Sequence, residues 1–559
     1  MSVEFELPAR REPDTPASAS TVRRWWRSPR LLLCLILLVS GGAIVLAMRR
    51  TSTTFDEIVM IAGGARGYET GAWNMAPEHP PVTQYLYGLL PYLAGVHYPD
   101  ETGAGGAAGR QGDFRYRFRY AQLFFSSSGN SPERVAFLGR LPAALCALLL
   151  ATLSFAFACR HYGDGAGLLA ATLVAFLPDV LAHGGVAYND LPVALSYFFA
   201  LWRIDEAIRR PSTARGVGAG LAVGIALGIK HSAVALAPAA VLLLVAEATL
   251  RRTDREWWKR VAPAAGVAGV AAYLTLVLIY RGDFALAEYR YALGFVFTQV
   301  TETAAPGYLL GRVSTQGFWY YFPVAFLFKT SAGFHVLLGI ALLYFGSRFT
   351  SLLQVVGSPL RVPAIGALVF GLLLIRSQLN IGFRYALPLL PLVAVITAVG
   401  VARVWQADWK RARPAIALAT AWLVVQPLSY FPNFLTYVSE YGPGRDRNYE
   451  VFADSSLDWG QGLLLLRDFM REHGIRVVYL SYFGSAWPSG YGIEYLPLVS
   501  FFLLPPAALR PGEPEPRWVV ISATNLTGTY LRGDPFHQFR EQRPAYVLGH
   551  SLYVYEARP

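Results

Sequence analysis

The chain carries eleven runs of apolar residues, most of them close to the length that crosses a lipid bilayer. They lie at 31–48, 136–158, 165–182, 191–204, 216–229, 233–249, 261–280, 322–346, 362–375, 386–402 and 414–430. A transmembrane helix needs about 20 apolar residues. Only 15% of the residues are charged, against about 25% in soluble domains, so too little polar sequence remains to cover a soluble core. The sequence therefore predicts a polytopic α-helical membrane protein with about eleven transmembrane helices, rather than a soluble enzyme or a disordered chain.

The distribution of basic residues predicts the orientation of these spans. Cytoplasmic loops of membrane proteins are enriched in Lys and Arg. With the N-terminus inside, the cytoplasmic turns hold Arg160; Arg203, Arg209, Arg210 and Arg215; Arg251, Arg252, Arg255, Lys259 and Arg260; Arg348 and Arg361; Arg403, Lys410, Arg411 and Arg413. The short external turns hold only Lys230, Arg376 and Arg384. Arg49 and Arg50 oppose the rule locally, but six arginines precede the first span. We therefore expect a cytoplasmic N-terminus, and we attribute the net charge of +12 to membrane orientation rather than to nucleic-acid binding.

This orientation divides the chain into three parts. Residues 1–30 form a cytoplasmic tail, 31–430 a transmembrane module with external segments at about 51–135 and 281–321, and 431–559 a periplasmic α/β domain. In the last part, 461–473 favours a helix, and 476–482, 517–523 and 545–555 favour strands. The Gly/Ala-rich stretch 101–112 is typical of a flexible excursion. The first apolar run could also belong to a signal peptide, but its length and the absence of a small-residue cleavage site favour an uncleaved span.

Acidic residues and a histidine follow the first span on the external side. Asp56 and Glu57 come a few residues after the bilayer, and His79 precedes two prolines. A carboxylate is a natural general base for a hydroxyl nucleophile, and a residue before proline is held in an extended conformation. The alternatives are that Asp56 caps a helix, that the acidic pair is only solvated, and that His79 is a turn residue.

Cations and aromatic residues mark the external ends of other spans. Arg140, Lys329 and Arg384 are cations at or near these ends, and a guanidinium can hold an anion bidentately. The alternative is that these side chains reach out to lipid headgroups. Asp190 lies at a turn between two spans, where it could bind a ligand or cap the next helix. Trp319 and Tyr320 could stack on a ligand or form an aromatic belt at the membrane interface.

Several short motifs occur in one order and on one predicted side of the membrane. They are Phe55-Asp56-Glu57, His79-Pro80-Pro81, Gly139-Arg140-Leu141-Pro142, Asn189-Asp190-Leu191-Pro192, Trp319-Tyr320-Tyr321-Phe322-Pro323 with Lys329-Thr330, and Asn380-Ile381-Gly382-Phe383-Arg384-Tyr385. In this combination the chain resembles the protein O-mannosyltransferase clan of the glycosyltransferase C superfamily, whose members use polyprenyl-phosphate sugars. The phrase Asp454-Ser455-Ser456-Leu457-Asp458-Trp459-Gly460-Gln461 is similar to a signature of bacterial members with a C-terminal periplasmic domain.

The sequence also departs from the eukaryotic members of this clan. Val82-Thr83-Gln84 follows the two prolines where those enzymes have a Leu-Gly-Lys-like continuation, and no segment resembles their β-trefoil domain. The acceptor of the eukaryotic enzymes is therefore not carried over, and a protein, a lipid or a glycan acceptor stays open.

The resemblance implies a multi-pass enzyme of the inner (plasma) membrane. Its reaction would move a hexosyl or pentosyl group from a polyprenyl-phosphate donor to a hydroxyl acceptor on the periplasmic side, with inversion. The implied roles are general base for Asp56, orientation of this base or acceptor binding for Glu57, binding of the donor phosphate for Arg384, Lys329 and Arg140, and substrate contacts for His79, Asp190, Trp319 and Tyr320.

Two questions about this function stay open at this stage. No cluster of metal ligands is evident in the sequence, and a divalent cation could still assist the reaction. A secondary transporter and a non-catalytic assembly protein on the same scaffold are the alternative functions. The concentration of polar residues at one face and the lack of two similar halves weigh against a transporter.

Overall fold

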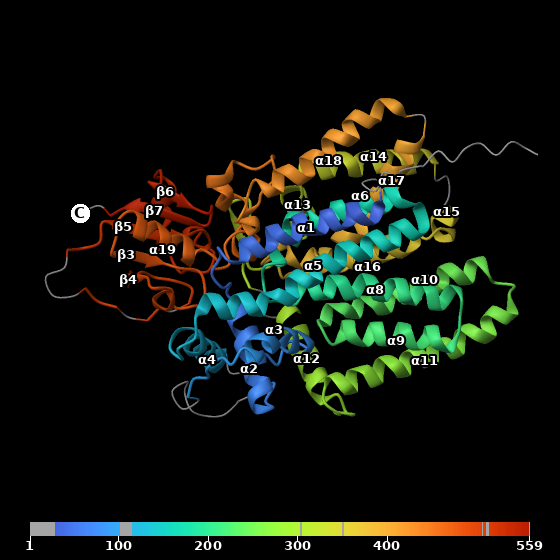
Figure 1. Cartoon of the computed structure of the whole chain (residues 1–559), viewed down its shortest axis with the longest axis horizontal. Helices are drawn as coiled ribbons and strands as arrows, with labels where there is room; N and C mark the ends of the chain where they lie inside the picture. Colours follow the sequence, from blue (N-terminus) through green and yellow to red (C-terminus); the bar gives the residue numbers. More distant parts are fainter. Residues whose placement is uncertain are drawn as a thin grey trace, which may run out of the picture.

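The chain folds into a bundle of long helices with a five-stranded sheet at one end (Figure 1). The structure is a computed structural model. It describes residues 28–100, 114–301, 305–348, 352–407, 409–502, 504–505, 507–509 and 514–557. The expected tail up to residue 27 and the expected excursion at 101–112 lie outside these ranges.

Helices occupy all of the predicted apolar runs. They are α1 (Pro29–Met48), α5 (Pro132–Tyr162), α6 (Asp164–Ala175), α7 (Pro178–His183), α8 (Asp190–Arg209), α9 (Thr213–Leu227), α10 (Leu236–Leu250), α11 (Arg255–Ile279), α13 (Tyr321–Lys329), α14 (Ala332–Arg348), α16 (Arg361–Arg376), α17 (Leu390–Gln406) and α18 (Arg413–Leu428). Two helices lie outside these runs, α12 (Ala287–Thr301) and α15 (Leu352–Gly357), and β1 (Gly307–Leu309) pairs with β2 (Arg312–Ser314) as an antiparallel hairpin.

The outer surface of the bundle is apolar, as expected of a multi-pass membrane protein. Leu278, Leu343 and Leu418 expose 78%, 69% and 71% of their area, and so large an apolar surface has to meet lipid. Four helical units in the described residues are long and apolar enough to cross a membrane alone: α1, α5, His231–Leu250 and α11. The predicted number of eleven spans is not confirmed by this criterion and stays a prediction.

Two of the predicted spans are broken, which corrects the sequence-based boundaries. The run 165–182 divides into α6 and α7 because Pro178, the first residue of α7, has no N–H group to continue the hydrogen bonds of α6. The run 322–346 divides into α13 and α14, which meet at 112°. At this bend Thr330 has extended backbone angles, so the helix ends at Lys329.

The external segment after α1 forms three helices beside the sheet. They are α2 (Glu57–Thr70), α3 (Val82–Leu93) and α4 (Phe114–Ser126). The backbones of α2 and α3 touch, because a Cβ atom on Gly64 would lie 2.2 Å from the carbonyl oxygen of Gln84. Only glycine permits such an approach. The contact fixes the start of α2, where Asp56 lies, against the His79-Pro80-Pro81 turn that precedes α3.

The C-terminal part is an α/β unit, as the sequence predicts. Its strands are β3 (Val477–Ser481), β4 (Glu494–Pro497), β5 (Trp518–Ser522), β6 (Tyr546–Leu548) and β7 (Leu552–Glu556), in the order β4-β3-β5-β7-β6. β3 is parallel to β4 and β5, and β7 is antiparallel to β5 and β6. The predicted helix is α19 (Leu463–Glu472), and α20 (Ala523–Leu526) and α21 (His537–Arg540) are short.

Two details of this unit differ from the sequence-based expectation. The range 545–555 was expected as one β-rich run, but it forms the hairpin β6–β7, in which Val547 pairs with Tyr553. The strand β4 was not expected.

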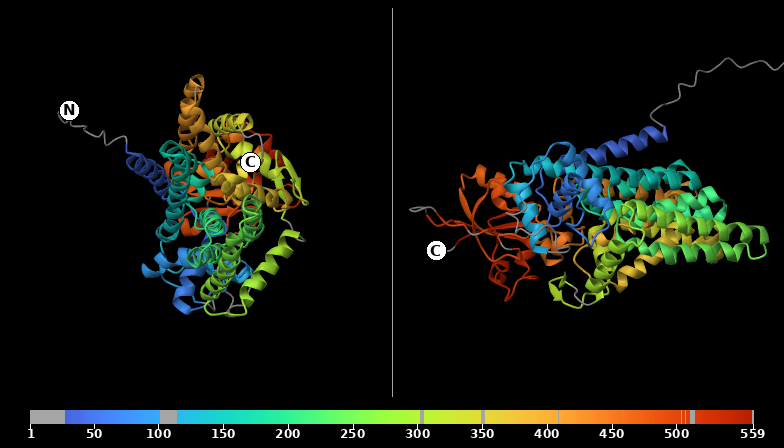
Figure 2. Two further views of the ribbon diagram at one scale, coloured as in Figure 1. Left: turned by 90° about the vertical axis from the view of Figure 1, so that its right-hand side faces the viewer. Right: turned by 90° about the horizontal axis from the view of Figure 1, so that it is seen from below.

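The sheet and the helices α2 to α4 lie at the same end of the bundle, and α1 begins at the opposite end (Figures 1 and 2). The segments predicted to be external are thus gathered at one end, which is where the polar residues of the motifs meet.

Candidate active site

Three of the predicted site residues come together at the end of the bundle that carries the sheet. Arg384, in the 3-10 helix Phe383–Ala386, lies between Asp56 before α2 and Asp190 at the start of α8. Its Nη2 is 3.7 Å from Oδ2 of Asp56, and its Nη1 is 3.6 Å from Oδ2 of Asp190. A cation flanked by two carboxylates is therefore the centre of the site.

Arg384 is buried but incompletely hydrogen-bonded. Only 3% of its side chain is exposed, and within the described part of the chain its Nε and Nη1 have no hydrogen-bond partner. Its guanidinium carbon lies 4.1 Å from the ring centre of Trp459, 4.8 Å from Tyr188 and 5.1 Å from Tyr385. Buried N–H groups without partners are costly. The aromatic rings hold the guanidinium in place, and its free N–H groups are suited to an anionic ligand.

A second cation, Lys230, joins this group. Its ammonium donates to Oδ1 of Asp190 and lies 4.8 Å from the ring centre of Tyr385. The sequence placed Lys230 at an external turn, but nothing in its neighbourhood distinguished it from a lysine that reaches to lipid headgroups. The contact with Asp190 adds it to the candidate site and gives Asp190 a role in orienting both cations.

Asp56 is the accessible carboxylate of the site. Its side chain is 30% exposed, whereas that of Asp190 is 2% exposed. Although Asp56 stands at the N-cap position of α2, its side chain makes no capping hydrogen bond. Desolvation by the surrounding protein raises the pKa of Asp56 above its usual 3.8, although Arg384 and Arg117 act to lower it. Helix capping therefore does not account for Asp56, and its carboxylate is available to a ligand.

Glu57 and Arg140 form a buried pair that holds the loop in front of Asp56. Nε and Nη2 of Arg140 donate to the two carboxylate oxygens of Glu57, each at 2.8 Å. Arg140 also donates to the carbonyls of Met48, Thr51 and Ser52 at 2.7–2.9 Å. Every nitrogen of this guanidinium is engaged. These contacts position the end of α1 and the start of α2, and they leave no nitrogen of Arg140 free for the donor phosphate that the sequence-based prediction assigns to it.

Lys329 is likewise engaged in the protein's own structure. Its ammonium donates to three carbonyl oxygens, those of Leu435, Tyr437 and Ser456, at 2.9–3.0 Å. No part of the side chain is exposed. An ammonium has three N–H groups, so none remains for a phosphate. The contacts do not favour the predicted role of Lys329 as a phosphate ligand. They join the bend after α13 to the segment that enters the C-terminal unit.

His79 borders the site, whereas the two aromatic residues of the Trp-Tyr motif do not. His79 Nε2 is 3.0 Å from the hydroxyl of Tyr188, whose ring contacts Arg384. Burial lowers the pKa of His79 to about 4, so it is neutral at pH 7. Trp319 is 72% exposed, and its ring contacts Tyr320. This exposure fits the alternative of an aromatic belt at the membrane interface better than a sugar platform.

The segment 454–461 joins the two loops that carry Asp56 and Arg384. The backbone N–H of Phe55 donates to the carbonyl of Trp459 at 2.8 Å, which fixes the residue before Asp56. The N–H of Phe383 donates to Oγ of Ser456 at 2.9 Å, which fixes the residue before Arg384. Trp459 itself covers the guanidinium of Arg384. Trp459 is thus a site residue that the sequence did not single out, although it lies in a recognised motif.

The same segment is anchored in the C-terminal sheet. The backbone N–H of Thr524, just after β5, donates to Oδ2 of Asp458 at 3.0 Å. The hydroxyl of Thr524 donates to the carbonyl of Asp458 at 2.9 Å. The sheet therefore holds the connection between the two loops of the site.

A metal centre is not indicated by the side chains at hand. Among the described ranges, no group of three or more His, Cys, Asp or Glu side chains is arranged to hold a metal ion.

The fold and this cluster define a multi-pass helical membrane protein with a polar site at the end that carries the α/β unit. Residues 123–280 match the model of the dolichyl-phosphate-mannose-protein mannosyltransferase family. The match confirms the predicted resemblance to the glycosyltransferase C superfamily. It spans less than a third of the chain, includes the motifs around Arg140 and Asp190, and leaves Asp56 and Arg384 outside.

Solved structures that align with this chain are distant from it. ArnT from Cupriavidus metallidurans bound to undecaprenyl phosphate shares 13% identity over 95% of this chain and 98% of that chain, with a TM-score of 0.49. The apo form of the same protein shares 16% over 72% and 64%, with a TM-score of 0.47. AglB from Archaeoglobus fulgidus, in complex with an inhibitory peptide and a dolichol-phosphate, shares 13% over 75% and 57%, with a TM-score of 0.45. No curated protein matches the sequence.

Proposed function

We propose that this chain is an integral-membrane glycosyltransferase. It transfers a hexosyl or pentosyl group from a polyprenyl-phosphate donor to a hydroxyl acceptor, at the periplasmic face of the inner membrane and with inversion. The observation that carries this proposal is the juxtaposition of Asp56, an accessible carboxylate, with Arg384, a buried guanidinium that has free N–H groups. A transfer from a phosphate ester to a hydroxyl needs one group of each kind.

Arg384 is the group that binds the donor phosphate. Its Nε has no partner among the described residues, and its Nη1 and Nη2 make only the long contacts of 3.6 and 3.7 Å to Asp190 and Asp56, so the guanidinium has N–H groups left to donate to phosphate oxygens. The positive charge stabilises the negative charge that develops on the phosphate as the glycosidic bond breaks. Lys230 and Arg384 both contact Asp190, so Lys230 adds to the positive potential around Arg384. Because Arg140 and Lys329 are fully engaged elsewhere, Arg384 is the principal phosphate ligand.

Asp56 is the general base for the acceptor. It takes the proton of the acceptor hydroxyl while the acceptor oxygen forms a bond to the anomeric carbon. The bond from this carbon to the phosphate oxygen breaks, and its electron pair leaves with the polyprenyl phosphate. A single displacement of this kind inverts the anomeric centre, since retention would need a second carboxylate as nucleophile.

This reaction requires the Asp56–Arg384 contact to open when the donor binds. In an in-line displacement the acceptor oxygen and the leaving oxygen lie on opposite sides of the anomeric carbon. The two side chains are 3.7 Å apart, so the sugar has to enter between them. The remaining contact of Arg384 with Asp190 keeps the guanidinium in place during this step.

The family match supports the donor class and leaves the acceptor open. The matched model is named for enzymes that use dolichyl-phosphate-mannose, and a polyprenyl-phosphate sugar is the corresponding chemistry. The acceptor is a protein, a lipid or a glycan that carries a free hydroxyl.

The decisive experiment is a transfer assay with the purified protein. A radiolabelled polyprenyl-phosphate sugar is supplied together with membrane fractions as the source of acceptors, and labelled product is separated from donor. Transfer that depends on Asp56 and Arg384 supports the proposal. Movement of the donor or of a solute across proteoliposomes without any labelled product would instead establish a transporter.

A further inference from the structure

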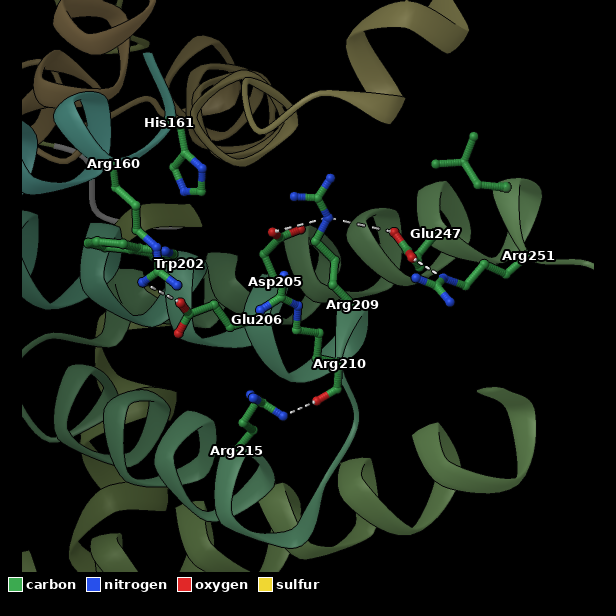
Figure 3. Close-up of a pocket in the computed structure, with 11 residues that line it drawn as sticks. Arg160, His161, Trp202, Asp205, Glu206, Arg209, Arg210, Arg215, Glu247 and Arg251 are labelled. Carbon is green, nitrogen blue, oxygen red and sulfur yellow. Dashed lines mark hydrogen bonds and ion pairs between the residues drawn. The ribbon is translucent and has the colours of Figure 1, made fainter. Parts of the chain in front are cut away.

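A second polar cavity lies at the opposite end of the bundle. Its volume is about 730 Å³, and it is formed where α5, α8 and α10 end and α9 begins (Figure 3). The helix α8 connects the two sites, since Asp190 is its first residue and Arg209 its last. Its 20 residues span about 30 Å, which is the thickness of the hydrocarbon core of a bilayer. The cavity is therefore at headgroup depth on the membrane face away from the candidate active site.

Arginines dominate the lining of this cavity. Five arginines and three carboxylates line it: Arg160, Arg209, Arg210, Arg215 and Arg251, with Asp205, Glu206 and Glu247. Figure 3 shows the side chains of Arg160, Arg209, Arg210 and Arg215 gathered around the same space. The lining thus carries more positive than negative charge.

Each carboxylate of the cavity is paired with at least one arginine. Arg361, which is fully buried behind the cavity, donates to Asp205 at 2.6 Å and to Glu247 at 2.5 Å. Glu206 pairs with Arg160 at 3.0 Å. Arg209 also pairs with Asp205, and Arg251 with Glu247, so the three carboxylates of the lining are shared among at least four arginines.

Arg210 and Arg215 carry the uncompensated charge. One Nη atom of Arg215 donates to the backbone carbonyl of Arg210 at 2.9 Å. Within the described ranges, no ion pair joins either guanidinium to a carboxylate, in contrast to Arg160, Arg209 and Arg251. The two side chains come from the end of α8 and the first turn of α9, so the short turn between these helices holds them side by side.

We propose that this cavity binds the phosphate group of an anionic ligand, with Arg210 and Arg215 as its principal contacts. Guanidinium groups bind phosphate oxygens bidentately, and basic pockets between transmembrane helices bind the headgroups of anionic lipids. The cavity lies at the level of the lipid headgroups, and Trp202 in its wall provides apolar surface beside the cations. The site is separate from the proposed glycosyl transfer, because a bilayer thickness divides the two.

The proposal can be tested by measuring ligand retention on the full-length protein in detergent. The protein is titrated with dioleoyl-phosphatidylglycerol, with dioleoyl-phosphatidylcholine and with inorganic pyrophosphate. The amount of each ligand bound is measured by native mass spectrometry. We expect the anionic lipid to bind more tightly than the zwitterionic lipid. The double variant Arg210→Ala/Arg215→Ala should lower the affinity for phosphatidylglycerol by on the order of tenfold or more, because each cation contributes to the attraction.

A matched control removes the same charge from the same end of the molecule. Arg252 and Arg255 are exposed and do not line the cavity, so Arg252→Ala/Arg255→Ala should retain the affinity of the parent protein. The melting temperature is recorded for each variant. If the alanine pair does not fold, Arg210→Gln alone replaces it.

The outcomes separate the two sources of the phosphate. Binding of phosphatidylglycerol that the alanine pair loses and the control keeps identifies a lipid site. Binding of pyrophosphate with the same dependence, and no preference between the lipids, identifies a soluble phosphate ligand. The proposal is overturned if the parent protein and the alanine pair bind all three ligands equally well. It is also overturned if the control pair loses as much affinity as the alanine pair.

Discussion

Replacing Asp56 by Asn distinguishes a catalytic site from an inert scaffold. The amide keeps the shape of the side chain and cannot accept the proton of a hydroxyl. Positioned general bases contribute about 10²–10⁴-fold to rates. We expect the transfer rate to fall by at least about 10²-fold, or about 2.7 kcal/mol in the barrier.

The structure indicates that this variant still folds. At 3.7 Å from Arg384, the Asp56 carboxylate contributes about 4 kcal/mol of direct Coulomb attraction at an effective dielectric constant near 20. Asp190 is 3.6 Å from the same guanidinium and makes a similar contribution, so Arg384 keeps a counter-charge in the variant. Asp56 also makes no capping hydrogen bond that the amide would disrupt. Loss of transfer should therefore occur without loss of the folded protein.

The pH dependence gives a second readout of the same substitution. A general base acts when it is deprotonated, so the rate rises with pH through the pKa of Asp56. Desolvation raises this pKa above 3.8, which moves the acidic limb of the profile to higher pH. In the Asp56→Asn protein the residual rate should lose this limb.

The assay is transfer of a radiolabelled sugar from a polyprenyl phosphate, measured from pH 4 to 9 on purified protein. Glu69→Gln is the matched control, because Glu69 is an exposed carboxylate on the same helix. It should retain full activity. A folded Asp56→Asn protein with an undiminished rate and an unchanged pH profile would refute the assignment of the base.

Four further predictions follow from the same contacts. Arg384→Ala should lower turnover by about 10²–10³-fold, and Arg384→Lys should lower it less; equal rates in both would contradict bidentate phosphate binding. Glu57→Gln should destabilise the protein by about 3 kcal/mol, measured as a lower denaturation midpoint, because it leaves the buried Arg140 without its counter-charge. Lys329→Met should reduce thermal stability rather than raise the KM for donor, because three buried carbonyls lose their donor. Reporter fusions at Asp454 and Arg255 should give signals from opposite sides of the membrane; signals from the same side would contradict the topology.

From the sequence, it was possible to predict which segments of the chain come together at the site. The roles of the basic residues in those segments were harder to predict. Asp56, Asp190 and Arg384 were expected on one face, and the structure brings them into contact. Arg140 looked equivalent to Arg384, since both are arginines near the external end of a span. They differ because Glu57, which lies 83 residues before Arg140, forms a salt bridge with Arg140 and not with Arg384. No local pattern encodes a pairing at that separation.

The helix boundaries likewise depend partly on local sequence and partly on contacts with distant residues. Proline marks the break before α7, so this boundary was readable from Pro178. The bend after Lys329 has no proline or glycine at the break, and it depends on carbonyls more than 100 residues away. The strand β4 has only four residues, Glu494–Pro497, which is too short to show an alternating pattern.

The hydrogen bonds between the segment 454–461 and the first external loop have a consequence for biogenesis. Ser52 donates to the carbonyl of Gly460, a residue 408 positions later in the chain. The loop that carries Asp56 leaves the ribosome early, but its partner is among the last quarter of the protein to be synthesised. The contacts that hold this loop are therefore incomplete until the segment 454–461 has been synthesised. If the proposed function holds, a chain that lacks its C-terminal unit would be inserted yet inactive, and it would not consume the lipid-linked donor.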